Sequence, residues 1–144
     1  MSLSLGDLND RLAVEDLIVR YANAMDSQDW DTFRSCFRPD ARTTMDLVGE
    51  FESPEAVRDF YRTRFTIFAA LQHFVSNVGV RLDGDRAVAQ TYFVSHHVPK
   101  EGKPYTHGGT FHFDVVRDAG EWRFSSHTIG ILWTSGVPSP VDQH

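Results

Sequence analysis

The chain has 144 residues, 41% of them apolar, with eleven Phe, one cysteine and a formal net charge of −6. This length suits one domain with a single core, a lone cysteine excludes an internal disulfide framework, and scattered basic residues exclude the concentrated positive surface that nucleic acids require. No apolar run reaches membrane-spanning length and the N-terminus is too polar for a signal peptide, so we expect a cytoplasmic protein without a membrane partner.

The first part of the chain predicts two helices. The apolar positions with a helical spacing are Leu8, Leu12, Leu17, Ile18, Tyr21 and Met25. This first helix should begin near Asn9 or Asp10, since either side chain could cap it. A second, shorter helix is expected from about Asp29 to Phe37, and it should end before Pro39.

Asp26 lies at the joint between these two helices and has two interpretations. Its side-chain oxygen could cap the second helix, a role for which aspartate is well suited. Alternatively, the rim of the helix pair could project the Asp26 carboxylate into an apolar cavity, where it would take part in general acid–base chemistry. The residues alone leave both interpretations open.

A short strand and a third helix should follow. The threonine-rich stretch from Arg42 to Leu47 predicts the strand, and Gly49 should end it. Ser53, followed by a proline and a glutamate, is a typical helix start. The third helix should reach about Ala69 or Ala70.

From Gln72 onward the apolar period changes from the helical value to two. The four expected strands are Gln72–Asp83, Arg86–Val98, Tyr105–Arg117 and Glu121–Thr134. Long consecutive strands with short turns form an antiparallel meander. We therefore predict a single α+β domain over residues 1–144, with an irregular tail at 136–144. Three N-terminal helices should pack on the concave side of a curved, mostly antiparallel sheet, leaving a cavity at the open end of a cone.

Histidines are the main chemical signal of the chain, which has seven. A zinc site needs three or four converging ligands, and the neighbouring pairs His96/His97 and His107/His112 are each separated by an odd number, so their members point to opposite sheet faces. We therefore expect no metal site. The sequence also contains no Gly-x-Ser-x-Gly elbow and no glycine-rich phosphate loop. The pair Gly108-Gly109 inside a strand indicates a bulge or a close backbone approach.

With metal, nucleophile and phosphate-loop sites excluded, an acid–base site inside an apolar cone remains. The same residues carry a family resemblance. The segments Met25-Asp-Ser-Gln-Asp-Trp-Asp, Leu71-Gln-His-Phe and Gly120-Glu-Trp-Arg-Phe make the chain resemble the SnoaL-like branch of the NTF2-like superfamily. The resemblance covers about Leu8 to Gly136. Within that branch the pattern is closest to scytalone dehydratase and bile-acid 7α-dehydratase. The resemblance implies a cone-shaped α+β barrel.

The resemblance also implies roles for particular residues. By matched motif, the catalytic Asp and His pair of scytalone dehydratase falls on Asp26 and His73. A second catalytic His falls on His97, or on His96 if the preceding turn aligns differently; strand alternation favours His97. A tyrosine five residues before the catalytic Asp of the bile-acid enzyme corresponds to Tyr21, which would donate a hydrogen bond to a substrate oxygen.

The substrate-binding residues that we expect come from the same comparison and from the strand pattern. Met25 and Met45 occupy the places of two tyrosines of scytalone dehydratase, and Thr110 occupies the place of a polar Asn, so scytalone itself is not the expected substrate. The full set of expected substrate-binding residues is Met25, Met45, Asn77, His96, Thr110, Ile129, Ile131 and Trp133.

The alternation of the first long strand conflicts with an inward His73. His73 and Asn77 have one parity, whereas Phe74, Val78 and Val80 have the other. If the cavity lies on the Phe74 side, His73 belongs to an interface. A β-bulge, for example at Gly79, would allow His73 to point inward.

The function expected from the sequence is a cofactor-free lyase or isomerase with dehydratase-like acid–base chemistry on a small hydrophobic, cyclic or aromatic molecule. Two alternatives remain: a non-catalytic ligand-binding or assembly module, such as the small subunit of a ring-hydroxylating dioxygenase, and a polyketide-type cyclase or hydrolase. Apolar residues on both sheet faces predict a homodimer, since helices can cover only one face.

Overall fold

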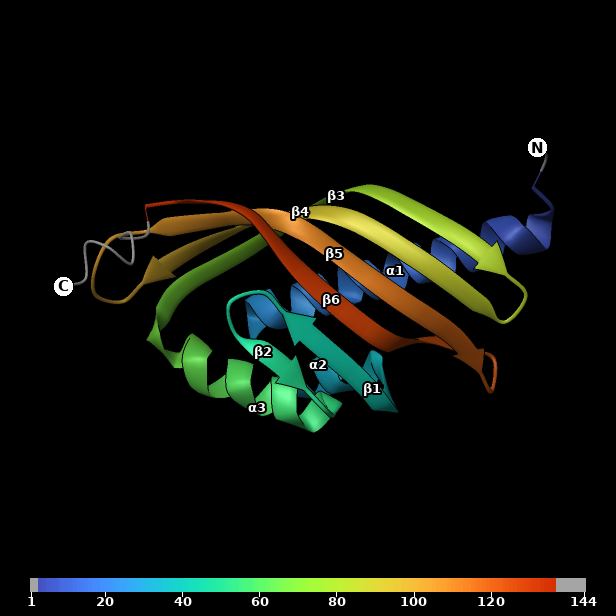
Figure 1. Ribbon diagram of the computed structural model, residues 1–144, viewed down its shortest axis with the longest axis horizontal. Helices are drawn as coiled ribbons and strands as arrows, with labels where there is room; N and C mark the ends of the chain where they lie inside the picture. Colours follow the sequence, from blue (N-terminus) through green and yellow to red (C-terminus); the bar gives the residue numbers. More distant parts are fainter. Residues whose placement is uncertain (1–2, 137–144) are drawn as a thin grey trace.

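The computed structural model describes residues 3–136, so most of the expected irregular tail at 136–144 lies outside the described residues. Helices and strands follow one another in the order α1 Leu5–Ser27, α2 Trp30–Ser35, β1 Phe37–Met45, β2 Gly49–Phe51, α3 Pro54–Arg64, β3 Phe68–Asp83, β4 Arg86–Pro99, β5 Tyr105–Asp118 and β6 Glu121–Ser135 (Figure 1). The predicted α+β class and the four-stranded meander are confirmed.

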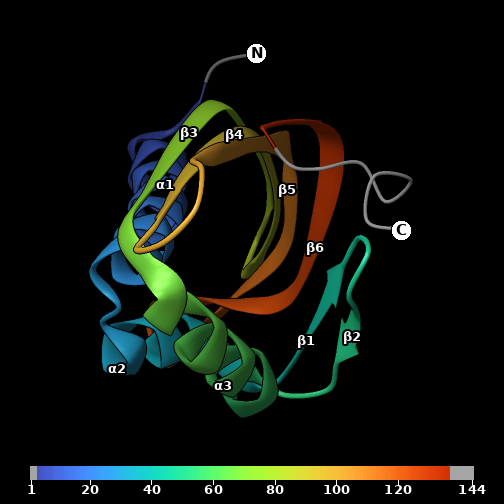
Figure 2. The ribbon, with the colours of Figure 1, turned by 90° about the vertical axis from the view of Figure 1, so that its left-hand side faces the viewer.

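The six strands form one sheet in the order β2-β1-β6-β5-β4-β3. All neighbours are antiparallel except β1 and β6, which run parallel. Figure 2 shows the sheet bending in an arc from β3 round to β2, with the three helices along the open side of the arc. This arrangement is the predicted cone, with the helices on its concave side.

The starts of the first two helices differ from the sequence prediction. The first helix, α1, begins at Leu5, and its cap is Ser4, whose hydroxyl accepts a hydrogen bond from the Asp7 amide while the Asp7 carboxylate accepts one from the Ser4 amide. This reciprocal capping box outcompetes the expected caps farther along the chain. The cap of α2 is Asp29, which accepts from the Thr32 amide. The interpretation of Asp26 as a helix cap is therefore wrong.

The boundary between α3 and β3 lies earlier in the chain than the sequence predicts. The helix starts as predicted, with Ser53 as its cap, but it ends at Arg64, and a 3₁₀ turn over Phe65–Ile67 leads directly into β3. Phe68 has the spacing of a helical residue, yet it pairs with Pro99 of β4. Sheet pairing overrides the helical pattern here.

The short strands differ from expectation as well. The strand β1 begins at Phe37 and continues through Pro39. Proline is tolerated because β1 and β6 lose their register between Phe37 and Arg42, so no ladder hydrogen bond is needed at Pro39. Gly49 does not end the strand region but opens the unpredicted strand β2, which pairs back onto β1.

A bulge in β3 decides which side chains face the cavity. The register with β4 shifts between Ser76 and Gly79, and Asn77 has a positive φ of 53°. On the N-terminal side of the bulge His73 points inward and Phe74 is 53% exposed, whereas beyond it Val78 and Val80 pack against the core. The bulge switches the face of the alternation and removes the conflict in the sequence pattern.

The core is dominated by aromatic side chains around Tyr21. Its ring packs edge-on against Phe111, Phe113 and Phe124, and all four residues are buried. Cys36 is part of this core, and burial raises the pKa of its thiol to about 11, which keeps it protonated and unreactive. Over residues 3–136, none of the helices combines the length and apolarity needed to cross a membrane.

Candidate active site

Asp26 and His73 form a hydrogen-bonded pair between α1 and β3. The Nδ1 atom of His73 donates to Oδ1 of Asp26 over 2.6 Å, and the His73 backbone amide donates to Oδ2 of the same carboxylate over 2.8 Å. Two bonds from one residue fix both the position of the imidazole and its tautomer, because an ionised carboxylate can only accept. The atom Nε2 is then the nitrogen left for a ligand. This geometry agrees with the expectation from the resemblance that Asp26 and His73 form a pair.

The position of Asp26 in the chain destabilises the helix that carries it but places its carboxylate beside His73. Asp26 lies in the last turn of α1, where the helix dipole disfavours an anion, and that turn contains no basic residue. Its interaction with His73, whose side chain is only 7% exposed, compensates for this position. A carboxylate held in this way positions an imidazole and fixes its tautomer.

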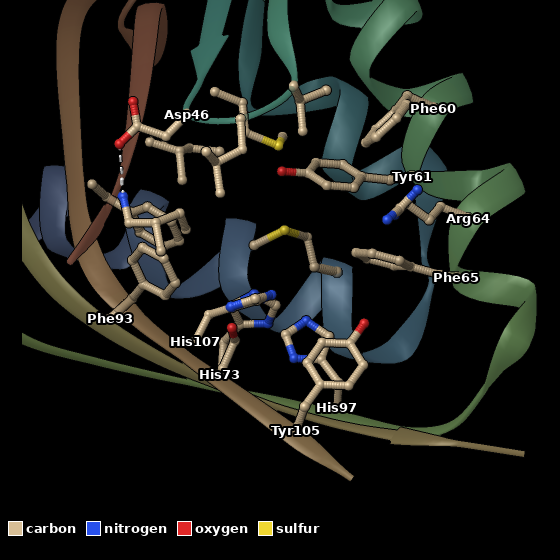
Figure 3. Close-up of a pocket in the computed structure, with 18 of the residues that line it drawn as sticks. Asp46, Phe60, Tyr61, Arg64, Phe65, His73, Phe93, His97, Tyr105 and His107 are labelled. Carbon is tan, nitrogen blue, oxygen red and sulfur yellow. Dashed lines mark hydrogen bonds between the residues drawn. The ribbon is translucent and has the colours of Figure 1, made fainter. Parts of the chain in front are cut away.

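The imidazole of His73 lines a cavity of about 340 Å³ beneath the sheet (Figure 3). This volume lies at the lower end of the range for small-molecule sites. Six residues expected at the site line the cavity: Met25, Met45, His73, His97, Ile129 and Ile131. Aromatic side chains from α3, the 3₁₀ turn after it, β4 and β5 form most of the remaining wall, including Phe60, Phe65, Phe93 and Phe111.

Other residues expected at the site lie elsewhere. Asn77 is exposed at the bulge of β3. His96 is on the outer face of the sheet, where it bonds to the Thr106 hydroxyl. Thr110 pairs in register with the exposed Tyr92 on that same outer face. Trp133 also lies outside the cavity lining, and its indole covers Gly108 so closely that a Cβ there would lie 2.0 Å from it.

Tyr21 does not contact the cavity. It is fully buried, and its hydroxyl lies 3.0 Å from Nε2 of His127. Because Nδ1 of His127 bonds to the His112 carbonyl, Nδ1 carries the proton and Nε2 accepts from Tyr21. Burial raises the pKa of Tyr21 well above its usual value. The Tyr21 hydroxyl therefore forms a hydrogen bond within the core and does not face a substrate oxygen.

Several polar side chains that the sequence interpretation did not include also line the cavity: Asp46, Tyr61, Arg64, Tyr105 and His107. One signal for His107 was available, because it has the same strand parity as Phe111 and Phe113. No comparable pattern marks Asp46, which follows the end of β1 and accepts a hydrogen bond from the Ile131 amide.

His97 and His107 form a neutral polar wall with Tyr105. The His97 ring stacks on Tyr105 with centroids 4.5 Å apart and meets His107 edge-on at 5.1 Å. Burial, reinforced by the neighbouring His107 and His73, lowers the pKa of His97 to about 4, and burial together with the Arg64 charge lowers the pKa of His107. Nδ1 of each ring is buried without a hydrogen-bond partner among the described residues, which further disfavours a charged ring.

Acid should destabilise the fold through two buried imidazoles, those of His127 and His97. Burial lowers the pKa of His127 to about 3 and that of His97 to about 4, whereas both groups have an ordinary pKa of 6.5 when unfolded. The unfolded chain therefore binds more protons, and stability that is complete above pH 6.5 is lost as the pH falls toward 4. We expect each imidazole to lower the free energy of unfolding by on the order of 1 kcal/mol per pH unit.

Urea denaturation between pH 7 and 4.5 measures this dependence. His97→Gln should reduce the slope of stability against pH, and the matched change His96→Gln, at an exposed position on the outer face, should leave it unchanged. An identical slope in all three proteins would contradict the assignment.

The site therefore combines one carboxylate-supported imidazole with a largely aromatic cavity. Such an arrangement can abstract a proton from a bound molecule and return it nearby. Within residues 3–136, no three His, Cys, Asp or Glu side chains are grouped as a metal ion would require.

Comparison with known proteins gives a family and several similar structures. A family model described as a SnoaL-like domain matches residues 6–128. The uncharacterised protein Rv2910c of Mycobacterium tuberculosis is 29% identical over 86 residues, which is 59% of this chain and 58% of that protein. The chain is thus matched to little more than half the length of its curated relatives.

Three solved structures have a similar fold over nearly the whole chain. A provisionally assigned aromatic ring hydroxylase from Novosphingobium aromaticivorans has a TM-score of 0.84 at 28% identity, covering 90% of this chain and 94% of its own. A provisionally assigned scytalone dehydratase from the same organism has a TM-score of 0.85 at 16% identity, with 92% and 90% covered. A type 2 hexachlorocyclohexane dehydrochlorinase, LinA, has a TM-score of 0.82 at 18% identity, with 92% and 95% covered.

Proposed function

The chain belongs to the SnoaL-like domain family, and we propose that it is a cofactor-free lyase or isomerase that acts on a small hydrophobic, cyclic or aromatic molecule. The observation that carries this proposal is the Asp26–His73 pair, which presents an oriented imidazole to a largely aromatic cavity. Structural neighbours named as a dehydratase and a dehydrochlorinase support the reaction class at the level of the fold.

In the proposed reaction His73 acts as the base and then as the acid. Its Nε2 takes a proton from a carbon of the substrate while Asp26 stabilises the resulting imidazolium through Nδ1. The electron pair of the broken C–H bond forms a carbon–carbon double bond, and a hydroxyl group leaves from the adjacent carbon. The imidazolium returns its proton to this hydroxyl group, so that water is released and the enzyme is regenerated.

The aromatic wall contributes by excluding water from this proton transfer. Phe93 and Phe111 stack with centroids 4.2 Å apart, and both lie within about 6.5 Å of the His73 ring. An apolar environment strengthens the hydrogen bond between the carboxylate and the imidazole. His97 provides a further neutral imidazole that could orient a substrate oxygen.

The proposal is tested by following a panel of small cyclic β-hydroxy ketones in D₂O by proton NMR. The wild-type protein should accelerate both the loss of water and the exchange of the acidic C–H, and His73→Gln should abolish the acceleration. Binding of the same compounds with equal exchange rates in both proteins would contradict catalysis and support a ligand-binding module instead.

We also propose that the protein forms a homodimer through the outer face of its sheet. Phe74, Tyr92 and Trp133 are about half exposed on this face, and the helices cover only the opposite one. A second copy would remove these rings from water. Light scattering at micromolar concentration should give about twice the chain mass of 16.4 kDa, and a monomer mass would contradict the proposal.

A further inference from the structure

Arg64 brings a positive charge to the wall of the cavity. It is the last residue of α3, and its side chain lines the cavity together with Phe60, Tyr61 and Phe65 (Figure 3). From this position we infer that the ligand carries an anionic group, and that the substrate class is a small aromatic or alicyclic carboxylate whose carboxylate binds Arg64. This inference rests on the proposed function for the reaction at His73, but the anion site can be tested separately.

The guanidinium of Arg64 has no carboxylate partner among residues 3–136. Elsewhere on the same helix Arg58 pairs with Asp59, and Arg34 of α2 pairs with Glu55. The interaction recorded for Arg64 is with the face of the Phe60 ring, at 5.7 Å from its centroid. Stacking of this kind holds a guanidinium in place while leaving its N–H donors free.

The carboxylate that lines the cavity is not paired with Arg64. Asp46 enters from the turn after β1, on the other side of the cavity from Arg64 (Figure 3). Its Oδ2 already accepts a hydrogen bond from the Ile131 amide over 3.0 Å. The cavity is therefore electrostatically asymmetric, with its cation on the α3 side.

The side chains next to Arg64 do not add a competing charge at neutral pH. Burial, together with the charge of the Arg64 guanidinium, lowers the pKa of His107, so its imidazole stays neutral. The same guanidinium acts on Tyr105, whose phenol nevertheless has a raised pKa because of burial and stays protonated. An anionic ligand group would thus meet one cation and neutral side chains that can donate hydrogen bonds, which favours its binding.

The remaining lining sets the shape and polarity of the rest of the ligand. A cavity of about 340 Å³ walled by Phe65, Phe93 and Phe111 suits one ring or a small fused system. Arg64 enters from α3 and His73 from β3, so a ligand anchored by its carboxylate would extend its ring toward the proposed base. Such an anchor would orient the reacting carbon without taking part in the chemistry.

Binding of benzoate and its neutral analogue benzamide tests the inference. Calorimetric titration of the whole protein should show benzoate bound about tenfold more tightly than benzamide, because a charge-assisted hydrogen bond to Arg64 is available only to the carboxylate. Arg64→Met should remove most of this preference. The matched control is Arg62→Met. Both arginines are exposed residues of the same helix, but Arg62 does not line the cavity, so this variant should keep the preference.

The outcomes separate the anion site from the proposed reaction. Equal affinity for benzoate and benzamide in the wild type, or an unchanged preference in Arg64→Met, would overturn the inference while leaving the acid–base proposal intact. Asp26→Asn should retain the preference for benzoate, since Asp26 does not contact the ligand. A preference that Arg64→Met removes, in a protein without turnover, would support the anion site and contradict only the proposed function.

Discussion

Asp26→Asn is expected to lower turnover by about 10²–10⁴-fold while the fold and ligand affinity stay nearly unchanged. The Asp26 carboxylate accepts two hydrogen bonds from His73, one from the backbone amide and one from Nδ1. An asparagine can accept only one of them with its oxygen, and its NH₂ group then faces the other donor. The favourable rearrangement moves the imidazole proton from Nδ1 to Nε2, so the nitrogen that faces the ligand can no longer act as a base.

The matched control for this substitution is Asp29→Asn. Asp29 caps α2 by accepting from the Thr32 amide and hydroxyl, which also lowers the pKa of its carboxyl group. Asparagine caps a helix about as well as aspartate, so the control should be silent in stability and in turnover. Steady-state kinetics and urea denaturation of the two variants make the comparison. Wild-type turnover in Asp26→Asn would remove the catalytic role of the pair.

Gly109→Ala is expected to lower the free energy of unfolding by about 2–3 kcal/mol. A Cβ at Gly109 would lie 1.9 Å from the Gly130 carbonyl oxygen and 2.9 Å from the Phe93 ring. The carbonyl belongs to the backbone of β6, so relief requires the two strands to separate next to a register shift between Gly108 and Gly109. Separation of the two strands should also move Phe93 and weaken ligand binding.

The matched control is Gly79→Ala in β3. A Cβ at Gly79 meets its nearest atom, the Gln90 carbonyl oxygen, at 3.9 Å, which is an ordinary contact distance. This variant should change stability by less than about 1 kcal/mol. Denaturant midpoints of the two variants give the comparison, and equal midpoints would show that the sheet absorbs a methyl group at Gly109 without strain.

Local patterns in the sequence determined much of the fold and part of the site. Uninterrupted alternation along β4 placed His97 inward and His96 outward, because a regular strand has a period of two. The segments around Asp26 and His73 carried a family resemblance, and that resemblance implied the pairing of these two residues. The glycine pair at Gly108-Gly109 indicated a close backbone approach, and the approach of Gly130 is the reason for it.

Other features depended on interactions between segments distant in the chain. Alternation along β3 could not place His73, since the bulge before Gly79 changes the face of the strand. Tyr21 has the spacing of a site residue, but its hydroxyl is the hydrogen-bond partner of the buried His127 and is therefore part of the core. Arg64 ends a helix like many exposed arginines, and only the packing of α3 against the open end of the sheet makes it part of a cavity. A local sequence pattern specifies the face and period of one element, whereas a cavity is formed by side chains of several elements, and their approach is set by the packing of the whole core.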